Sequence, residues 1–268
     1  MKTNMTTEKK ADLVVVIDSL NVPAPTVHPF IGRILKTTAQ TGLDTKVLVA
    51  MHSGLDPKNT QEIDLLLQRE FPGIASSVIV KDNTFAYAYL KGLETAAKLG
   101  DRVIEIDSGG GHLPEELSNL VKQLNYYDIV LSTRFNNGGV NTYPWQRQLA
   151  SRSATLLSNL FLDTNLTDAA SGFQGFRSQV IKDMFSVVPP EKWSSAVQGP
   201  FHMYQTEIRA IVSWMHNYSY TEVPISYGLE KDGKPLPLSY LLAALRCFHR
   251  IYKDKGLIQS QLGRYGGR

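Results

Sequence analysis

The chain has few cysteines and no long apolar stretches, the features typical of proteins from oxidising compartments and of membrane-spanning proteins. Its 268 residues include one cysteine, Cys247, which excludes an internal disulfide framework and a multi-cysteine zinc site. No apolar stretch approaches the ~20 residues that a membrane-spanning helix needs. Net charge is only +3 and 43% of the residues are apolar, which excludes an intrinsically disordered chain. We therefore expect a folded protein with no transmembrane segment.

The two ends of the chain differ from the rest. Residues 1–11 are expected to be a flexible leader, because the short apolar run before Asp18 is not a signal peptide. Residues 241–268 are predicted to form an amphipathic basic helix and a flexible tail, which suits lipid or nucleic-acid phosphates. A solvated tail with no partner is the plainer interpretation. We expect a cytoplasmic protein, with peripheral contact at a membrane as a further option.

Apolar runs alternate with helical patterns through the first half of the chain. Leu13-Val14-Val15-Val16-Ile17 is a β-branched run typical of a strand buried on both faces. Alternation of strands and helices with short links predicts an α/β fold, a mostly parallel sheet flanked by helices. The expected strands are 13–17, 46–50, 77–81, 102–106 and 128–132, and the expected helices are 28–41, 63–70, 86–99 and 114–124.

The second half contains longer helices separated by loops rich in Gly, Pro and Asn. No break in composition marks a second domain, so residues 12–240 are expected to form one domain. The expected helices are 145–162, 178–185, 204–216 and 239–253, with a short strand between the 168–176 loop and the helix at 178, and a strand over 220–227.

The segment that follows the fourth expected strand is the most informative. It reads Asp107-Ser108-Gly109-Gly110-Gly111-His112 and leads into a helix that starts near Pro114. Ligands of open α/β sheets bind at the carboxyl ends of strands, and glycines let the backbone approach an anion. The spacing is neither a dinucleotide fingerprint nor a Walker loop. The alternative is a flexible turn in which Asp107 only caps the backbone.

Several motifs, in order along the chain, resemble those of family 2 glycosyltransferases. Residues 100–116 are similar to the segment that carries the family's Asp-x-Asp metal motif. The dolichyl-phosphate mannose synthases are most similar, because His112-Leu113-Pro114-Glu115 stands where they have His-Pro-Pro-Glu. The resemblance implies a single GT-A domain. The other matching segments are 14–21, 87–93, 128–134, Trp145 with Arg147, Ser151 and Arg152, 168–173 (Asp-x-x-Ser-Gly-Phe) and 222–225 (Glu-Val-Pro-Ile).

The resemblance implies transfer of a hexose or pentose, with inversion, from a nucleotide-sugar to a polyprenyl phosphate. Asp107 would hold Mg²⁺ or Mn²⁺ at the diphosphate, where negative charge develops. Arg134, Arg147 and Ser151 would bind the acceptor's phosphate, although a solvated helix face also accounts for Arg147. The implied donor-binding residues are Asn21, Asp56, Ser108, Gly109, His112, Lys231 and Lys234.

The chain also departs from the family's pattern. Gly109 replaces the second Asp of the metal motif, and Gly111 replaces a Gln two residues later. Met51-His52 replaces an acidic pair that recognises the donor's base, and Glu230 replaces an Arg. These changes predict weakened or remodelled metal binding and a donor other than GDP-mannose.

The acceptor decides which acids take part in catalysis. A phosphate is already an anion, whereas a hydroxyl needs a base, with Asp168 the first candidate and Glu207 the second. Asp168 equally suits a loop cap, and Glu207 an ion pair. The main alternative acceptor is a hydroxymethylated DNA base, flipped out of the duplex, with Arg134 and Arg147 on DNA phosphates. A degenerate fold that only binds nucleotide or nucleic acid stays open.

Overall fold

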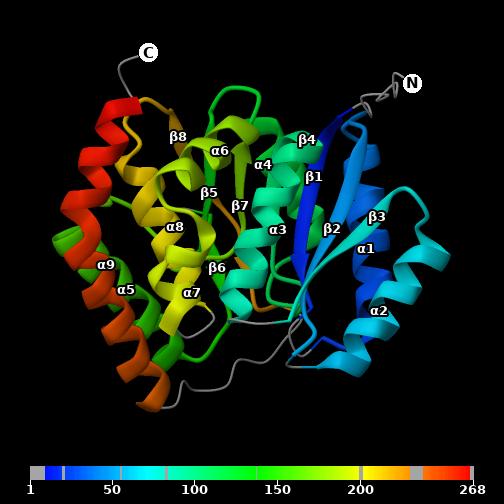
Figure 1. Ribbon diagram of the computed structural model, residues 1–268, viewed down its shortest axis with the longest axis horizontal. Coiled ribbons are helices and arrows are strands. Elements are labelled where there is room, and N and C mark those ends of the chain that lie inside the picture. The colour runs from blue at the N-terminus through cyan, green and yellow to red at the C-terminus, as the bar shows by residue number, and fades with distance from the viewer. Residues whose placement is uncertain are drawn as a thin grey trace, which may run out of the picture.

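A seven-stranded sheet runs through the middle of the molecule and carries helices on both faces (Figure 1). The computed structural model describes residues 10–19, 22–54, 56–81, 84–136, 138–198, 202–229 and 238–265. Every neighbouring pair of strands is parallel except the two that β7 makes with β4 and β5. In spatial order the strands are β3 (Ala75–Val80), β2 (Thr45–His52), β1 (Ala11–Asp18), β4 (Gly100–Ile106), β7 (Gln174–Arg177), β5 (Ile129–Thr133) and β8 (Tyr220–Pro224).

Strand β1 shows how the sequence builds two cores from one run. Successive side chains of a strand point to opposite faces, so a strand between two helical layers is apolar throughout. Leu13, Val15 and Ile17 pack into one apolar cluster. Val14 and Val16 pack into the other, on the opposite face of the sheet. The prediction of a mostly parallel sheet flanked by helices is confirmed.

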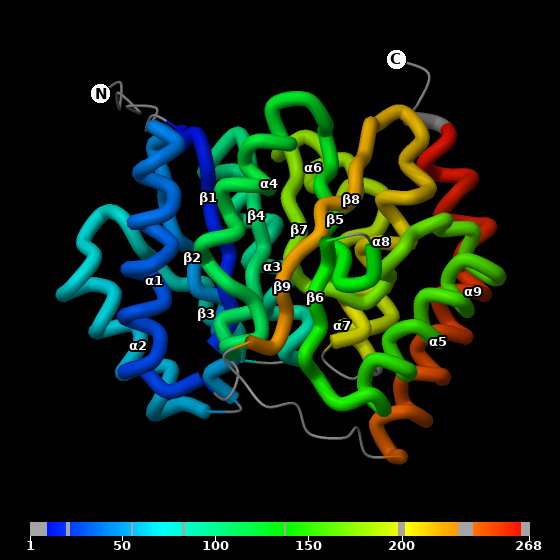
Figure 2. The backbone as a smooth tube through the Cα atoms, turned by 180° about the vertical axis from the view of Figure 1, so that it is seen from behind, coloured from blue at the N-terminus to red at the C-terminus, as the bar shows by residue number. Residues whose placement is uncertain are grey.

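The helices divide between the two faces (Figures 1 and 2). The first layer covers β1 and β2 from one side, and the second covers the sheet from the other. Helix α5 (Trp145–Leu162) contacts α8 and α9 at the outer edge of the second layer. The first layer contains α1 (Ala24–Ala39), α2 (Pro57–Glu70) and α4 (Leu117–Gln123), and the second contains α3 (Phe85–Leu99), α6 (Ser178–Val187), α7 (Ser194–Gln198), α8 (Met203–Trp214) and α9 (Leu238–Tyr265).

Several elements differ from the sequence-based expectation, and for three of them the structure shows the detail. Helix α2 begins six residues earlier than the expected residue 63, at Pro57, because the Asp56 side chain accepts the Asn59 N–H at 3.1 Å and caps it. The expected strand 220–227 is interrupted at Ile225, after which Ser226 and Tyr227 form β9 and pair with β6 (Val140–Asn141). Helix α9 continues through Gly263 to Tyr265, where a flexible tail was expected, because Ile258 and Leu262 pack into the core.

The strand order indicates which edge of the sheet binds ligands in folds of this type. The chain winds from β1 towards β3 on one side of β1 and places β4 on the other, so β1 and β4 flank the point where the order reverses. Ligands of such sheets bind outside the carboxyl ends of the strands at this point. Asp18 ends β1 and Asp107 follows β4, so both acids lie there. Of the helices described, none combines the length and apolar character needed to cross a bilayer.

Candidate active site

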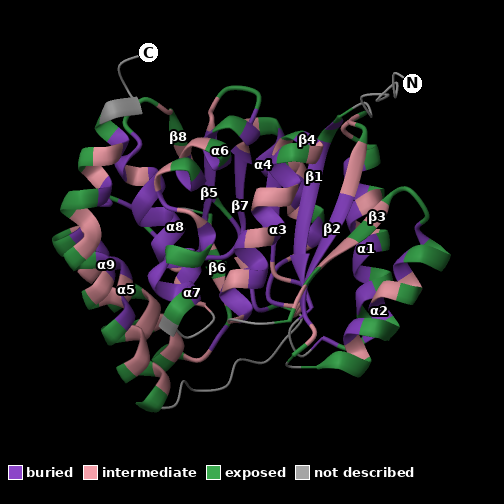
Figure 3. Ribbon diagram, viewed as in Figure 1, coloured by how far each residue is buried: buried purple, intermediate pink, exposed green. Residues whose placement is uncertain are grey.

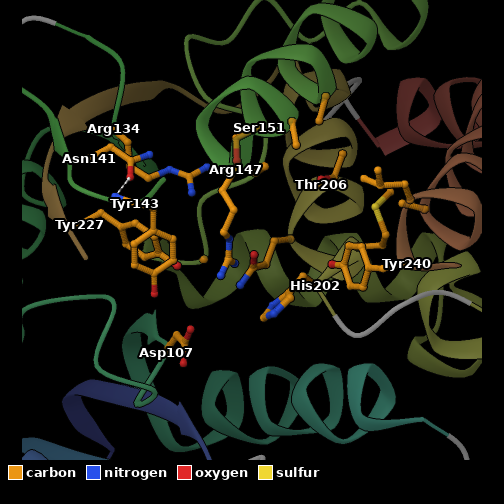
Figure 4. A pocket seen from close by; sticks show the side chains of 18 of the residues that line it. Asp107, Arg134, Asn141, Tyr143, Arg147, Ser151, His202, Thr206, Tyr227 and Tyr240 are labelled. Carbon is orange, nitrogen blue, oxygen red and sulfur yellow. Dashed lines mark hydrogen bonds between the residues drawn. The ribbon is translucent and has the colours of Figure 1, made fainter. Parts of the chain in front are cut away.

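A cavity of about 140 Å³ opens beyond the carboxyl ends of β4 and β5 (Figure 4). Its walls come from the β4–η1 segment (η1 is Pro114–Glu116), the β5–β6 loop, β9 and helices α5, α8 and α9. Asp107 lies on one side, and Arg147 points into the cavity from the other. The structure therefore brings the expected metal ligand and an expected phosphate ligand to the same cavity.

Asp107 stands in a loop that is held by the end of β1. Its Oδ1 accepts the Gly109 N–H at 2.7 Å, so this part of the loop is pinned by the acid itself. Asp18 Oδ1 accepts the Ser108 N–H at 2.8 Å, and the Asp18 carboxyl interacts electrostatically with Asp107. Burial, and then the charge of Asp107, raise the pKa of Asp18 well above its ordinary value. Two carboxyl groups in such contact need a shared proton or a cation between them.

Glycine at 111 is required by the neighbouring strand β9. A Cβ at Gly111 would lie 2.7 Å from Cε2 of Tyr227, closer than side chains pack. The Gln that the resemblance predicts at this position therefore has no room, because the Tyr227 ring occupies its space. The departure at 111 is a change of packing that sequence reasoning had no signal for.

His112 lies in the cavity wall with neither ring nitrogen hydrogen-bonded. It is 2% exposed and packs between Phe173 and Tyr227, with ring centroids 5.5 and 4.7 Å away. Burial lowers its pKa to about 4, although the charge of Asp107 opposes this shift. At neutral pH the ring is uncharged, and its one N–H donor and one acceptor nitrogen are both buried without a hydrogen-bond partner.

Arg134 is fixed by a buried carboxylate. Its Nε donates to Asp168 Oδ2 at 2.7 Å, its NH2 donates to Oδ1 at 2.8 Å, and its backbone N–H also reaches Oδ2. Burial would raise the pKa of Asp168, but the Arg134 guanidinium lowers it below its ordinary value. Asp168 is fully buried and is not part of the cavity wall, whereas Arg134 is. The geometry gives Asp168 the task of orienting Arg134 and leaves it no path to a substrate proton.

Helix α5 brings the other two expected acceptor residues to the same cavity. Arg147 and Ser151 are four residues apart, so they share one face of the helix, and both line the cavity. The Arg147 guanidinium stacks 4.6 Å over the ring of Tyr143, which holds it towards the cavity. Two guanidinium groups and a hydroxyl, from α5 and from the loop after β5, therefore face one space, the arrangement that suits a phosphate.

Glu207 holds the backbone together away from the cavity. Its two carboxylate oxygens accept the N–H groups of Ser194 and Ser195, each at 2.8 Å, at the start of α7. The side chain is 3% exposed, and burial raises its pKa. Glu207 is not in the cavity wall, so its position suits a structural task and not that of a base.

Of the remaining donor-binding candidates, those among the described residues do not line the cavity. Ser108 is engaged with Asp18, and its hydroxyl also donates to the Asp18 carbonyl. Asp56 caps α2 and does not line the cavity. Asn21, Lys231 and Lys234 lie outside the described residues.

Sequence reasoning missed most of the polar and aromatic wall. Asn141, Tyr143, Tyr227, His202 and Gln205 all line the cavity. They come from three segments of the chain, and no local pattern links them. Asp18 was also missed, although it had a readable signal: like Asp107, it follows directly after a buried apolar run.

Comparison with known proteins gives partial relatives and a shared fold. No protein-family model matches the chain. Residues of this chain are 30% identical over 151 positions to polyprenol monophosphomannose synthase of Mycolicibacterium smegmatis, covering 54% of this chain and 53% of that protein. They are 30% identical over 97 positions to undecaprenyl-phosphate mannosyltransferase of Micrococcus luteus, covering 35% and 40%. The chain thus matches about half the length of these curated relatives, and the resemblance found in its motifs agrees with their names.

Two solved structures share the architecture. Glucosyl-3-phosphoglycerate synthase of Mycobacterium tuberculosis, solved with Mn²⁺, UDP-glucose and glycerol 3-phosphate, superposes with a TM-score of 0.52 at 15% identity over 94% of this chain and 80% of that one. A mannosyltransferase of Pyrobaculum calidifontis, solved with GDP-mannose and Mn²⁺, gives 0.51 at 13% over 95% and 70%. The chain has the GT-A glycosyltransferase fold.

The Glu207→Ala substitution should destabilise the protein without removing a catalytic group. Two buried N–H groups would lose their acceptor, which costs about 2–5 kcal/mol in the free energy of unfolding. Urea denaturation measures this loss, and Glu62→Ala on the exposed face of α2 is the control. A stable Glu207→Ala protein that binds donor and acceptor but turns over none would contradict the structural role.

The buried His112 should make the protein less stable in mild acid. Its folded pKa of about 4 lies below the ordinary value of 6.5, so the unfolded chain takes up the proton first as the pH falls. Stability from this group is complete above pH 6.5 and is lost as the pH falls towards 4. The loss reaches about 2 kcal/mol at pH 5. Urea unfolding at pH 7.5 and 5.0 should show a smaller drop for His112→Phe than for the wild type, and equal drops would refute this.

Proposed function

We propose that this chain is a glycosyltransferase that moves a sugar from a nucleotide-sugar to a polyprenyl phosphate. The observation that carries the proposal is the convergence of Arg134, Arg147 and Ser151 on one cavity, with Asp107 on its far side. The first group suits an acceptor phosphate, and the second suits a donor diphosphate. The names of the partial relatives and the shared GT-A fold support the same reaction class.

The acids at the edge of the sheet fit a divalent cation only in part. Within the described residues, no set of three or more His, Cys, Asp or Glu side chains comes together as a metal site. Asp107 with its buried neighbour Asp18 supplies carboxylate oxygens, which Mg²⁺ and Mn²⁺ accept, and diphosphate oxygens and water would complete the shell. The cation would neutralise charge on the departing diphosphate. Both structural neighbours were solved with Mn²⁺.

The acceptor side favours a phosphate over a hydroxyl. A hydroxyl must lose its proton to a base, but Asp168 and Glu207 are buried and engaged in hydrogen bonds. His112, with its pKa near 4, is a weak base at neutral pH. Asp107 is the one acid in the wall formed by described residues, and it faces the donor side. An anionic phosphate needs no base, so these residues suffice for it.

The chemistry is a single displacement with inversion. A phosphate oxygen of the acceptor attacks the anomeric carbon of a hexose as the bond to the nucleoside diphosphate breaks. The electron pair leaves with the diphosphate, and no proton is transferred in the step. Arg134 and Arg147 would hold the attacking phosphate in line, which replaces a bimolecular encounter by a fixed geometry.

A groove beside the cavity suits the hydrocarbon part of such an acceptor. It has a volume of about 510 Å³ and lies between α5 and α9, with Leu157, Leu245 and Phe248 in its wall. Ala150, Ala154, Met203 and Leu241 line both the groove and the cavity, so the two spaces share walls. A polar head in the cavity would thus continue into an apolar chain in the groove, a combination that neither DNA nor a free nucleotide offers.

Two substitutions separate the donor and acceptor sides of the cavity. Asp107→Asn should lower kcat at least 100-fold, because the carboxylate that faces the diphosphate is lost. Arg147→Ala should raise the KM for polyprenyl phosphate about 10- to 100-fold through the loss of a charge-assisted contact. Release of nucleoside diphosphate from a panel of UDP- and GDP-sugars, each with farnesyl phosphate, measures both constants.

Arg69→Ala, on the exposed end of α2, is the matched control and should keep both constants within twofold. Full activity of Asp107→Asn with and without chelator would overturn the donor assignment. Transfer to hydroxymethylated DNA but not to lipid phosphate would establish the DNA reading. Nucleotide binding with no turnover on either acceptor would establish a non-catalytic binder.

A further inference from the structure

Helix α5 presents a row of large apolar side chains to solvent. Trp145, Leu149, Leu156 and Leu160 are 68, 55, 59 and 63% exposed. Their spacing of four, seven and four residues places them along one line of the helix. The buried residues of α5 are Thr155, Ser158 and Leu162, which lie on the opposite side. The outward face of α5 is therefore more apolar than the face packed against the protein.

Helix α9 lies beside α5 and repeats the pattern (Figures 1 and 2). Its buried side includes Cys247 and Ile251, and the rest of the helix is largely half-buried or exposed (Figure 3). Eleven of the nineteen large apolar side chains exposed in the described residues lie on these two helices, so they form a concentrated surface. We call this surface the α5–α9 face; on α9 it includes Leu238, Leu241, Leu242, Leu245 and Tyr252.

Basic side chains outnumber acids on the α5–α9 face. Of the two arginines of α5, Arg152 is exposed and Arg147 points into the cavity; the helix contains no acid, although Asp163, directly after it, is exposed and pairs with Lys255. On α9, Arg246, Arg250 and Lys253 follow at helical spacing and run alongside the apolar row. The one acid of α9, Asp254, is half-buried and stands outside that row. An apolar stripe bordered by basic residues is the pattern of helices that lie in a membrane interface, where the cations meet anionic headgroups.

We propose that the α5–α9 face docks on the surface of a bilayer that contains anionic phospholipids. Exposed apolar patches of this kind mark interaction sites, and the excess of basic side chains along the apolar row favours an anionic lipid surface as the partner. Trp145 and Leu149 also line the apolar groove, so docking would bring the groove's opening to the lipid. The inference deepens the proposed function, but the exposure and the charge stand without it.

Trp145 provides a built-in fluorescence reporter for docking of this chain. The other two tryptophans, Trp193 and Trp214, are 0 and 3% exposed, so a change of fluorescence on docking belongs to Trp145. Vesicles of phosphatidylcholine with phosphatidylglycerol should shift its emission to the blue and protect it from iodide. Vesicles of phosphatidylcholine alone should do so at least tenfold more weakly. Trp145→Phe should abolish the shift, while the protein still sediments with the anionic vesicles.

A double substitution tests the surface itself. Leu156→Glu with Leu160→Glu changes the outward row without touching the wall of the cavity or the groove. Sedimentation with anionic vesicles should fall at least tenfold. Leu65→Glu on α2 starts from a similar exposure of 57% and should leave sedimentation unchanged. Circular dichroism confirms that the three proteins keep the same fold.

Three results would overturn the docking proposal. The first is that the wild-type protein binds neither kind of vesicle, and the second is that the double variant sediments with anionic vesicles as well as the wild type does. The third is that the wild type is a dimer in solution and the double variant is a monomer, because the face would then be a dimer interface. Farnesyl phosphate disperses in water, so transfer to it can be measured without vesicles. This assay distinguishes a failure of the docking proposal from a failure of the proposed function. Transfer to farnesyl phosphate with no vesicle binding would refute docking alone. Vesicle binding with no transfer would refute the proposed function and leave docking in place.

Discussion

The buried pair of Arg134 and Asp168 is the interaction on which the candidate site depends. It joins the loop after β5 to the loop before β7, and Arg209 ties the same region by donating to the carbonyls of Ser132 and Asp168. A buried ion pair gains little net stability, but loss of one partner leaves an unpaired charge in the interior. The main effect of the pair is therefore to fix the position of the Arg134 guanidinium at the cavity, and its net contribution to the stability of the protein is small.

On the opposite side of the cavity, a second pair of ionisable side chains consists of two groups that would carry charges of the same sign. Asp18 and Asp107 are both acids, so their contact is unfavourable unless a proton or cation lies between them. The two arise because β1 and β4 are neighbours at the reversal of strand order. With Gly109 in place of the motif's second Asp, an acid from the adjacent strand stands beside Asp107. The cavity thus has a wall that attracts cations and a wall that attracts anions.

The features of the fold and of the candidate site that were predictable are those that short segments of the sequence encode. The run from Leu13 to Ile17 predicts a buried strand, and the parallel sheet follows from the alternation of strands and helices. The short strand expected before residue 178 is present as β7, but its antiparallel pairing with β4 and β5 was not predicted, because its partners lie far along the chain. Asp107, Arg134, Arg147 and Ser151 were chosen from motifs and lie around one cavity, although their roles stay predictions. The burial of Asp168 and Glu207 depends on tertiary packing, which composition and spacing do not report.

The contact of Gly111 with Tyr227 has a consequence for engineering this wall of the cavity. A side chain at 111 collides with that ring, and the ring in turn packs on His112 and Tyr143. A larger residue at position 111 is therefore compatible with this packing only when residue 227 is made smaller in the same protein. The two positions form one packing unit, so a single substitution at 111 also disturbs the aromatic contacts around His112.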